Sequence, residues 1–286
     1  MKKFIHLSDL HIGDDEQTSE NQYLKVIIDH ILRRYKTVKN KPVILITGDI
    51  TDNGQEDEYK KAVELLSIFK TNGFILKIVP GNHDYGPCGN IYTEKSQDNF
   101  KKYILEELLE IKLSYTTNGL FDVYPIVEEV DGVVYIALDS VIDNDNELLH
   151  FASGEMGERQ LKKLAGILRG YIKTDKVRVA YFHHHPVERS SFLKMDDAQK
   201  VMGVLSDVVD FICFGHKHKE EELDGSEYGV RHILASGKST EVKRVRDIFK
   251  PNGEKLNYKE ILTYKEVSIL DRNNSSITKY ELCLTK

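Results

Sequence analysis

The chain has no tryptophan, little cysteine and no long apolar run. Its 286 residues include three cysteines, and an odd, sparse set of this kind does not form a disulfide framework. Cys213 lies inside an apolar run, where we expect a core thiol. No apolar stretch approaches the roughly 20 residues that a helix needs to cross a bilayer. These absences argue against a disulfide-stapled scaffold and against a membrane protein.

An excess of basic residues is also missing. Forty Lys and Arg stand against 46 Asp and Glu, which gives a net charge of −6. This balance argues against nucleic acid as a partner held by bulk charge, although it leaves room for a local basic patch. No signal peptide precedes the first motif, so we expect a cytoplasmic protein.

Strand-like and helix-like segments alternate along the chain, without internal repeats or low-complexity linkers. Helical spacing of apolar residues predicts helices at 21–35, 56–70, 100–111 and 158–168. Apolar runs predict strands at 4–7, 42–47, 74–79, 177–182, 209–214 and 231–235. Turn signals at 131–132 and 271–274 predict antiparallel hairpins that join 121–130 to 133–138 and 264–270 to 276–283. Residues 141–157 and 186–199 show little periodicity and are predicted to be loops or short helices.

These patterns predict an α/β protein with one domain over residues 1–286. The first half has βαβ units and a parallel sheet, and the second half adds antiparallel strands. Two mixed sheets packed face to face, with helices outside, would accommodate both halves. Residues 224–286 would supply C-terminal strands that complete a sheet.

Five short polar blocks carry the chemistry of the sequence. They are Asp9-Leu10-His11, Gly48-Asp49, Gly81-Asn82-His83-Asp84, His183-His184-His185 and Gly215-His216-Lys217-His218. Most follow directly on an apolar run, so their side chains are expected where a strand meets a loop. Several such ends side by side would build a metal cluster.

Two of the blocks place ligand-type residues two positions apart after a strand. Asp9 with His11, and His216 with His218, can each point to the same side and share a metal. On its own, Asp-x-His is more often a surface turn. Asp49 follows a glycine that permits a sharp turn, and its two carboxylate oxygens could bridge two metals, although a cap or turn is the alternative.

Other polar residues of these blocks suit supporting or catalytic roles. Asp52 is expected to accept a hydrogen bond from a ligand rather than to bind metal. The amide oxygen of Asn82 can bind metal, while His83 could donate a proton to a leaving group, with Asp84 fixing its orientation. The three consecutive imidazoles that begin at His183 cannot all point the same way, so one or two are expected to face the site.

The mixture of ligand types indicates which metals would bind. None of the five blocks contains a thiolate, which disfavours a structural zinc site. Histidine, aspartate and asparagine together suit Mn, Fe or Zn better than Ca. The blocks supply enough nitrogen and oxygen ligands for two divalent ions per chain.

Taken in order, the five blocks resemble the signature of the calcineurin-like metallophosphoesterase superfamily. That signature is Asp-x-His, Gly-Asp-x-x-Asp, Gly-Asn-His-Asp/Glu, a His and Gly-His-x-His, and every element is present within residues 9–218. The stretches 6–11 and 48–54 look most like the bacterial branch related to class III cyclic-nucleotide phosphodiesterases. The region after residue 224 carries no signature element.

The resemblance implies a four-layer αββα sandwich with a dinuclear centre at one end of the sheets. One metal would take Asp9, His11, Asp49 and His218, and the other would take Asp49, Asn82, His184 and His216. His184 is preferred because the family ligand stands two positions before the proline, and His183 and His185 stay open as alternatives. His83 would be the proton donor, oriented by Asp84.

The resemblance also implies a metal-dependent phosphoesterase in which a hydroxide held between the metals attacks phosphorus. Asn53 stands where protein Ser/Thr phosphatases of the superfamily carry arginine, which argues against that branch. We expect a small phosphate-ester substrate, preferably a phosphodiester such as a cyclic nucleotide. A phosphomonoesterase or a nuclease is the alternative. The retained ligand set argues against a metal-free protein-interaction scaffold, and the sequence leaves the oligomeric state open.

Overall fold

The first sheet is built around three parallel strands joined by helices. A computed structural model describes residues 1–114, 119–141, 153–187, 195–246 and 258–284. β1 (Lys2–Leu7), β2 (Val43–Thr47) and β3 (Ile75–Val79) run parallel, with α1 (Ser19–Arg34) and α2 (Glu56–Thr71) as crossovers. The C-terminal strands β10 (Lys243–Arg246), β11 (Tyr258–Ile269) and β12 (Ser275–Cys283) extend this sheet in the order β10-β11-β1-β2-β3, with β12 paired to β11.

The second sheet has the order β4-β5-β6-β7-β9-β8. Its strands are β4 (Ile126–Val130), β5 (Val133–Ala137), β6 (Val177–Tyr181), β7 (Phe211–Phe214), β8 (Glu221–Asp224) and β9 (His232–Ala235). β5, β6, β7 and β9 are parallel, while the edge strands β4 and β8 are antiparallel to their neighbours. α5 (Gly157–Leu168) and α6 (Ala198–Leu205) accompany this sheet.

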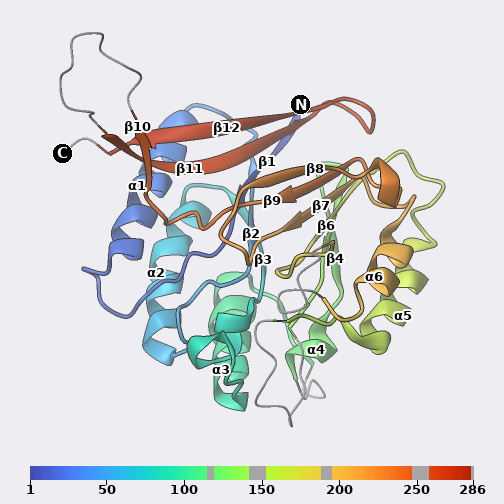
Figure 1. Cartoon of the computed structure of the whole chain (residues 1–286), viewed down its shortest axis with the longest axis horizontal. Coiled ribbons are helices and arrows are strands. Elements are labelled where there is room, and N and C mark those ends of the chain that lie inside the picture. The colour runs from blue at the N-terminus through green and yellow to red at the C-terminus, as the bar shows by residue number, and fades with distance from the viewer. Residues whose placement is uncertain (115–118, 142–152, 188–194, 247–257, 285–286) are drawn as a thin grey trace.

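Alternation along the strands divides the apolar residues among three cores. Val43 and Leu45 of β2 pack into the core between the two sheets, together with Phe211 of β7. Ile44 and Ile46, which point the other way, pack into a core with α1 and α2. A third core joins α5 and α6 to the outer face of the second sheet. Figure 1 shows the resulting helix–sheet–sheet–helix layers, so the predicted four-layer sandwich is confirmed.

Both predicted hairpins are present, and they differ from the prediction only in extent. Asp131 and Gly132 connect β4 to β5 with positive φ angles of 50° and 71°, as expected for a type I′ turn. The second turn joins β11 to β12, and pairing extends from Ile269 and Ser275 back to Ile261 and Cys283.

Two predicted segments have a different structure. The strand expected to start at residue 121 begins at Ile126, and α4 (Leu120–Val123) precedes it. Pro125 has no N–H to donate to a sheet, which limits pairing on that side. The helix expected at 100–111 is a π-helical segment, Phe100–Leu108, which continues α3 (Glu94–Asn99).

Several short elements were not predicted from the sequence. These are α6, β8 and β10, together with the 3-10 turns Asn82–Tyr85, Pro87–Gly89 and Ser226–Tyr228. Within the two segments of weak periodicity, residues 142–152 and 188–194 lie outside the described part of the chain. Among the described helices, none has the length and apolar character needed to cross a bilayer.

Candidate metal centre

The five polar blocks follow the carboxyl ends of β1, β2, β3, β6 and β7. Backbone hydrogen bonds continue the pairing of the strands into these blocks. Asp9 N–H donates to the Gly48 carbonyl at 3.1 Å, and Gly215 N–H donates to the His183 carbonyl at 3.0 Å. Because the blocks leave parallel strands at the same edge, their side chains from both sheets meet at one end of the sandwich.

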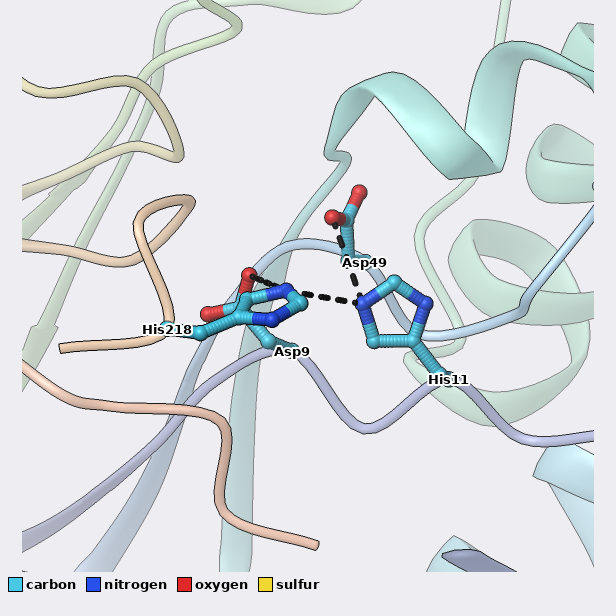
Figure 2. A group of neighbouring side chains, drawn as sticks. All are labelled: Asp9, His11, Asp49 and His218. Carbon is cyan, nitrogen blue, oxygen red and sulfur yellow. Dashed lines mark hydrogen bonds and ion pairs between the residues drawn. The ribbon is translucent and has the colours of Figure 1, made fainter. Parts of the chain in front are cut away.

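One group of side chains consists of Asp9, His11, Asp49 and His218, which Figure 2 shows facing one another. One ligand atom from each lies within 4.8 Å of the others. His11 Nε2 is 3.2 Å from His218 Nε2 and 3.7 Å from Asp49 Oδ2. His218 Nε2 is in turn 3.5 Å from Asp9 Oδ1. The four residues proposed for one metal are therefore close enough to share an ion.

A second group forms around His183 on the other side of Asp49. His183 Nε2 lies 3.2 Å from Asp49 Oδ2, 3.1 Å from Asn82 Oδ1 and 3.2 Å from His216 Nδ1. The same oxygen of Asp49 thus faces both groups. This is the arrangement that a bridging carboxylate would have.

Backbone groups hold the outward-facing atoms of two ligands, the carboxylate of Asp49 and the amide of Asn82. Asp49 Oδ1 accepts a hydrogen bond from the N–H of His83 at 2.9 Å, which leaves Oδ2 to face the histidines. Asn82 donates its Nδ2–H to the Gly89 carbonyl at 3.1 Å, so Oδ1 points toward His183. These partners fix which atom each side chain presents to the centre.

The histidine rings are fixed in the same way. A carboxylate or carbonyl oxygen can only accept, so His11 Nδ1 donates to Asp52 Oδ1 at 3.1 Å, and His183 Nδ1 donates to the Thr47 carbonyl at 2.8 Å. Each ring is left with Nε2 toward the centre. The contact of His11 agrees with the role expected for Asp52, that of an acceptor behind a ligand.

The donor set fits divalent cations. With Nδ1 protonated, Nε2 of a neutral His183 presents a lone pair to the oxygens of Asp49 and Asn82, which are also acceptors. Either a proton on Nε2 or a bound cation must therefore lie between these atoms. Burial, the largest single effect, would lower the pKa of His183, but the charge and hydrogen bond of Asp49, together with Asp9 and the Thr47 carbonyl, raise the pKa to about 9. A metal ion would replace that proton.

Asp49 is held ionised by its surroundings. Burial favours the neutral acid, but the neighbouring His183 and His11 rings lower the pKa of Asp49 well below its usual range. An ionised carboxylate between two imidazoles is the form that binds metal.

The backbone at the centre is unusual for residues with side chains. Five of the predicted ligands have positive φ, with 52° at Asp9, 45° at His11, 49° at Asp49, 74° at His216 and 54° at His218. Such conformations are uncommon outside glycine and persist only where the surrounding structure imposes them. Here they turn ligand side chains inward after β1, β2 and β7.

Two glycines allow the close approach of these loops. A Cβ at Gly48, where φ is 87°, would lie 2.5 Å from Nδ1 of His183. A Cβ at Gly81 would lie 2.3 Å from Oδ1 of Asp49. Both positions exclude side chains because the ligands occupy that space.

The structure places His183, and not the predicted His184, against Asp49 and Asn82. His184 Nδ1 lies 2.9 Å from the hydroxyl of Ser140, and its ring lies 4.5 Å from that of His216. The prediction counted back from Pro186, whereas the orientation is set by the end of β6, after which successive side chains point to opposite sides. His184 thus lies next to the second group, and its Nε2 is buried without a hydrogen-bond partner among the described residues.

Asp84 also has contacts that differ from the prediction. Its buried carboxylate accepts hydrogen bonds from the N–H groups of Ile50, Thr51 and Gly81, and so joins the loops after β2 and β3. The ring of His83 instead donates from Nδ1 to the Asp52 carbonyl at 2.7 Å. The orientation of His83 comes from that carbonyl, because the hydrogen bonds of Asp84 go to backbone groups and to the Thr51 hydroxyl.

Residues after β9 support the first block and were not predicted. Ser239 N–H donates to the Ser8 carbonyl at 3.0 Å, and Ser8 N–H donates to the Ser239 hydroxyl at 3.0 Å. The Thr240 hydroxyl donates to the Leu10 carbonyl at 3.0 Å. These small polar residues follow the strand predicted at 231–235. Their position after a strand, like that of the five blocks, is the sequence feature that could have pointed to them.

Comparison with known proteins identifies relatives of the chain. The family model described as calcineurin-like phosphoesterase matches residues 2–220. A probable cyclic nucleotide phosphodiesterase from Coxiella burnetii is 24% identical over 226 residues, which is 76% of each chain. A probable glycerophosphodiester phosphodiesterase from Arcobacter nitrofigilis is 26% identical over 187 residues, covering 64% of this chain and 57% of the relative.

Solved structures show the same fold at low sequence identity. A dimetal phosphatase from Danio rerio has a TM-score of 0.59 and 14% identity, with 96% of this chain and 98% of that chain covered. The GAP50 anchor in the inner membrane complex of Plasmodium has a TM-score of 0.54 and 13% identity, with 100% and 89% covered. At these identities the likeness concerns the fold alone.

Proposed function

Because this chain belongs to the calcineurin-like phosphoesterase family and is a metal-dependent phosphoesterase, we propose that it hydrolyses a phosphodiester at the centre around Asp49. The observation that carries this proposal is the shared position of Asp49 Oδ2, which faces His11 at 3.7 Å and His183 at 3.2 Å. One oxygen between two sets of inward-facing ligands suits a pair of cations.

The chain offers a complete set of ligands for each of two ions. One would be held by Asp9, His11, Asp49 and His218, and the other by Asp49, Asn82, His183 and His216. When bound, two divalent ions supply Lewis-acid stabilisation of phosphoryl oxygens and lower the pKa of water. Nitrogen and oxygen ligands without thiolate favour Mn, Fe or Zn.

His83 has the geometry of a proton donor to the leaving group. Its Nδ1–H is used by the carbonyl of Asp52, so Nε2 is the atom that can carry a second proton. The ring lies edge-on to that of His11, with centroids 4.6 Å apart, which places it beside the first group. A protonated Nε2 at this position can donate to an alkoxide as the ester bond breaks.

The preference for a phosphodiester, with a cyclic nucleotide as one candidate, is supported by the relatives. The names of the Coxiella and Arcobacter proteins both describe phosphodiesterases. Phosphomonoester hydrolysis by the same centre is the competing proposal, because the ligands described here would bind either kind of phosphoryl group.

A substrate comparison tests the proposal. The purified protein, supplied with Mn, is assayed against bis-p-nitrophenyl phosphate, p-nitrophenyl phosphate and cyclic AMP, with chelator-treated protein as the control. We expect a higher kcat/KM for the diesters and no turnover after chelation. A higher kcat/KM for the monoester would reject diesterase function while leaving the phosphoesterase centre intact.

A further inference from the structure

A short segment directly after β5 contacts two of the loops that carry ligands of the second group. It consists of Asp139 and Ser140, and both residues are buried. Neither belongs to the five polar blocks. Their hydrogen bonds show how a part of the chain without ligands can support the second group.

The hydroxyl of Ser140 accepts two backbone hydrogen bonds from the loop after β6. The N–H of His183 donates to Ser140 Oγ at 3.2 Å, and the N–H of His184 donates to it at 3.1 Å. A hydroxyl oxygen has two acceptor lone pairs, so these two N–H groups use both of them. Because the ring of His183 faces Asp49 and Asn82, Ser140 fixes the backbone from which that ligand projects.

The carboxylate of Asp139 holds the turn that carries Asn82. The hydroxyl of Tyr85, the last residue of the 3-10 turn Asn82–Tyr85, donates to Asp139 Oδ2. The other oxygen, Oδ1, accepts a hydrogen bond from the N–H of Val141 at 2.9 Å. The carboxylate is thus oriented by its own segment while it receives the bond from the turn.

The helix α5 and the residues before it fix the position of the segment itself. Gln160 accepts from the N–H of Asp139 at 2.9 Å and donates its Nε2–H to the Asp139 carbonyl at 2.7 Å. The N–H of Glu155 donates to the Ser140 carbonyl at 3.0 Å. These backbone bonds make the segment a fixed base for the two ligand loops.

The first group of ligands has a different support. Ser239 and Thr240 hold the block that contains Asp9 through hydrogen bonds to its backbone. The two ions of the proposed centre would therefore depend on separate parts of the chain. A change in one support should affect one ion more than the other.

We propose that Asp139 and Ser140 are positioning residues for the second ion, and that they set the separation of His183 and Asn82 by holding the loops that carry them. Neither residue touches the substrate, and no bond to either forms or breaks. The role rests on the proposed function, because it requires an ion at the second group.

Metal affinity measured at one position at a time tests this role. His218→Ala removes a ligand of the first group and leaves the second group complete, whereas His183→Ala does the opposite. Ser140→Ala is added to each of these two backgrounds, and Mn binding is measured by titration calorimetry. We expect about tenfold weaker binding in the His218→Ala background, the size typical for partners behind a metal ligand, and unchanged binding in the His183→Ala background.

Tyr85→Phe is a second, milder variant, which removes the hydroxyl that donates to Asp139 and keeps the ring. It should also weaken Mn binding in the His218→Ala background alone, and it tests the role even if Ser140→Ala does not fold. Ser239→Ala is the matched control, because it removes a buried hydroxyl that supports the Asp9 block. It should weaken Mn binding in the His183→Ala background instead.

Two results would overturn the role of the segment. One is unchanged Mn binding by these variants in the His218→Ala background, and the other is equal weakening in both backgrounds, which would indicate a general loss of structure. Absence of Mn binding by His218→Ala itself would reject the second group as a metal position, and this role with it. Failure of the proposed function is distinguishable, since a wild type that binds two ions but cleaves no diester would reject diesterase activity while the metal affinities still decide the role.

Discussion

Three consecutive histidines follow β6, and each has different contacts. His183 faces Asp49 and Asn82, His184 contacts Ser140, and His185 Nε2 lies 3.0 Å from a carboxylate oxygen of Glu221. The sequence indicated that these rings must diverge but not which one turns inward. That choice depends on where β6 ends, and a difference of one residue reverses the side to which a side chain points.

Replacing each of the first two histidines by alanine should separate their roles. His183→Ala should lose one of two metals per chain, because its Nε2 faces the second group. His184→Ala should keep both metals but lose about 2–5 kcal/mol of stability, as buried large-to-small changes do. Metal analysis and denaturant unfolding measure the two effects. Loss of metal from His184→Ala alone would restore the assignment made from the sequence.

His83→Ala should keep both metals and lose about 10²-fold or more in turnover, as expected for the removal of a general acid. The loss should be larger for cyclic AMP than for bis-p-nitrophenyl phosphate, because nitrophenolate leaves readily without a proton. Steady-state rates for the two substrates measure the difference. A rate equal to that of the wild type would remove His83 from the mechanism.

His6, buried in β1, should make stability depend on pH. Burial, with a smaller effect of the Lys265 charge, lowers the pKa of His6 to about 3. Between about pH 6.5 and 3 the unfolded chain therefore binds a proton that the folded chain does not, so stability falls as the pH falls. His6→Gln should show a smaller loss of unfolding free energy between pH 7 and 4. An equal loss in both proteins would contradict this assignment.

At the scale of elements, the strand ends were the most predictable feature. Apolar runs followed by Asp9, Asp49, Asn82 and His216 indicated both the strands and the loops where ligands collect, and the described strands end within a few residues of the predicted positions. Patterns of this kind predict strand ends well, because a buried strand must be apolar and the polar residues that follow it must lie outside the core.

Contacts between separate loops could not be predicted. The carboxylate of Asp84 joins the loops after β2 and β3, and Ser239 supports the block that contains Asp9. Sequence spacing carries no information about such pairs, since they depend on how the loops pack. The short elements α6 and β8 were missed because few residues define their periodicity.

Gly48 should be essential to the geometry of the centre. In Gly48→Ala the new Cβ would meet the ring of His183 at 2.5 Å, at a φ of 87° that disfavours alanine. We expect lower stability and weaker metal binding.

Gly166→Ala is the control, because that helix position has open space around it and alanine should stabilise the helix by about 0.5–1 kcal/mol. Unfolding curves and metal titrations compare the two. Unchanged metal affinity in Gly48→Ala would contradict the close packing described here.

At the scale of the whole molecule, the centre depends on both sheets. The first sheet supplies Asp9, His11, Asp49 and Asn82, and the second supplies His183, His216 and His218. The core between the sheets, which includes Phe4 and Phe211, sets their separation. The sequence predicted two mixed sheets, but the distances between their loops required the folded structure.

The number of metal ions per chain tests the central claim most directly. Elemental analysis of the Mn-loaded protein should give two ions for the wild type. Asp49→Ala should give at most one, because the oxygen of Asp49 that faces both groups is removed. Full occupancy in Asp49→Ala, or less than one ion in the wild type, would contradict a dinuclear centre bridged by this residue.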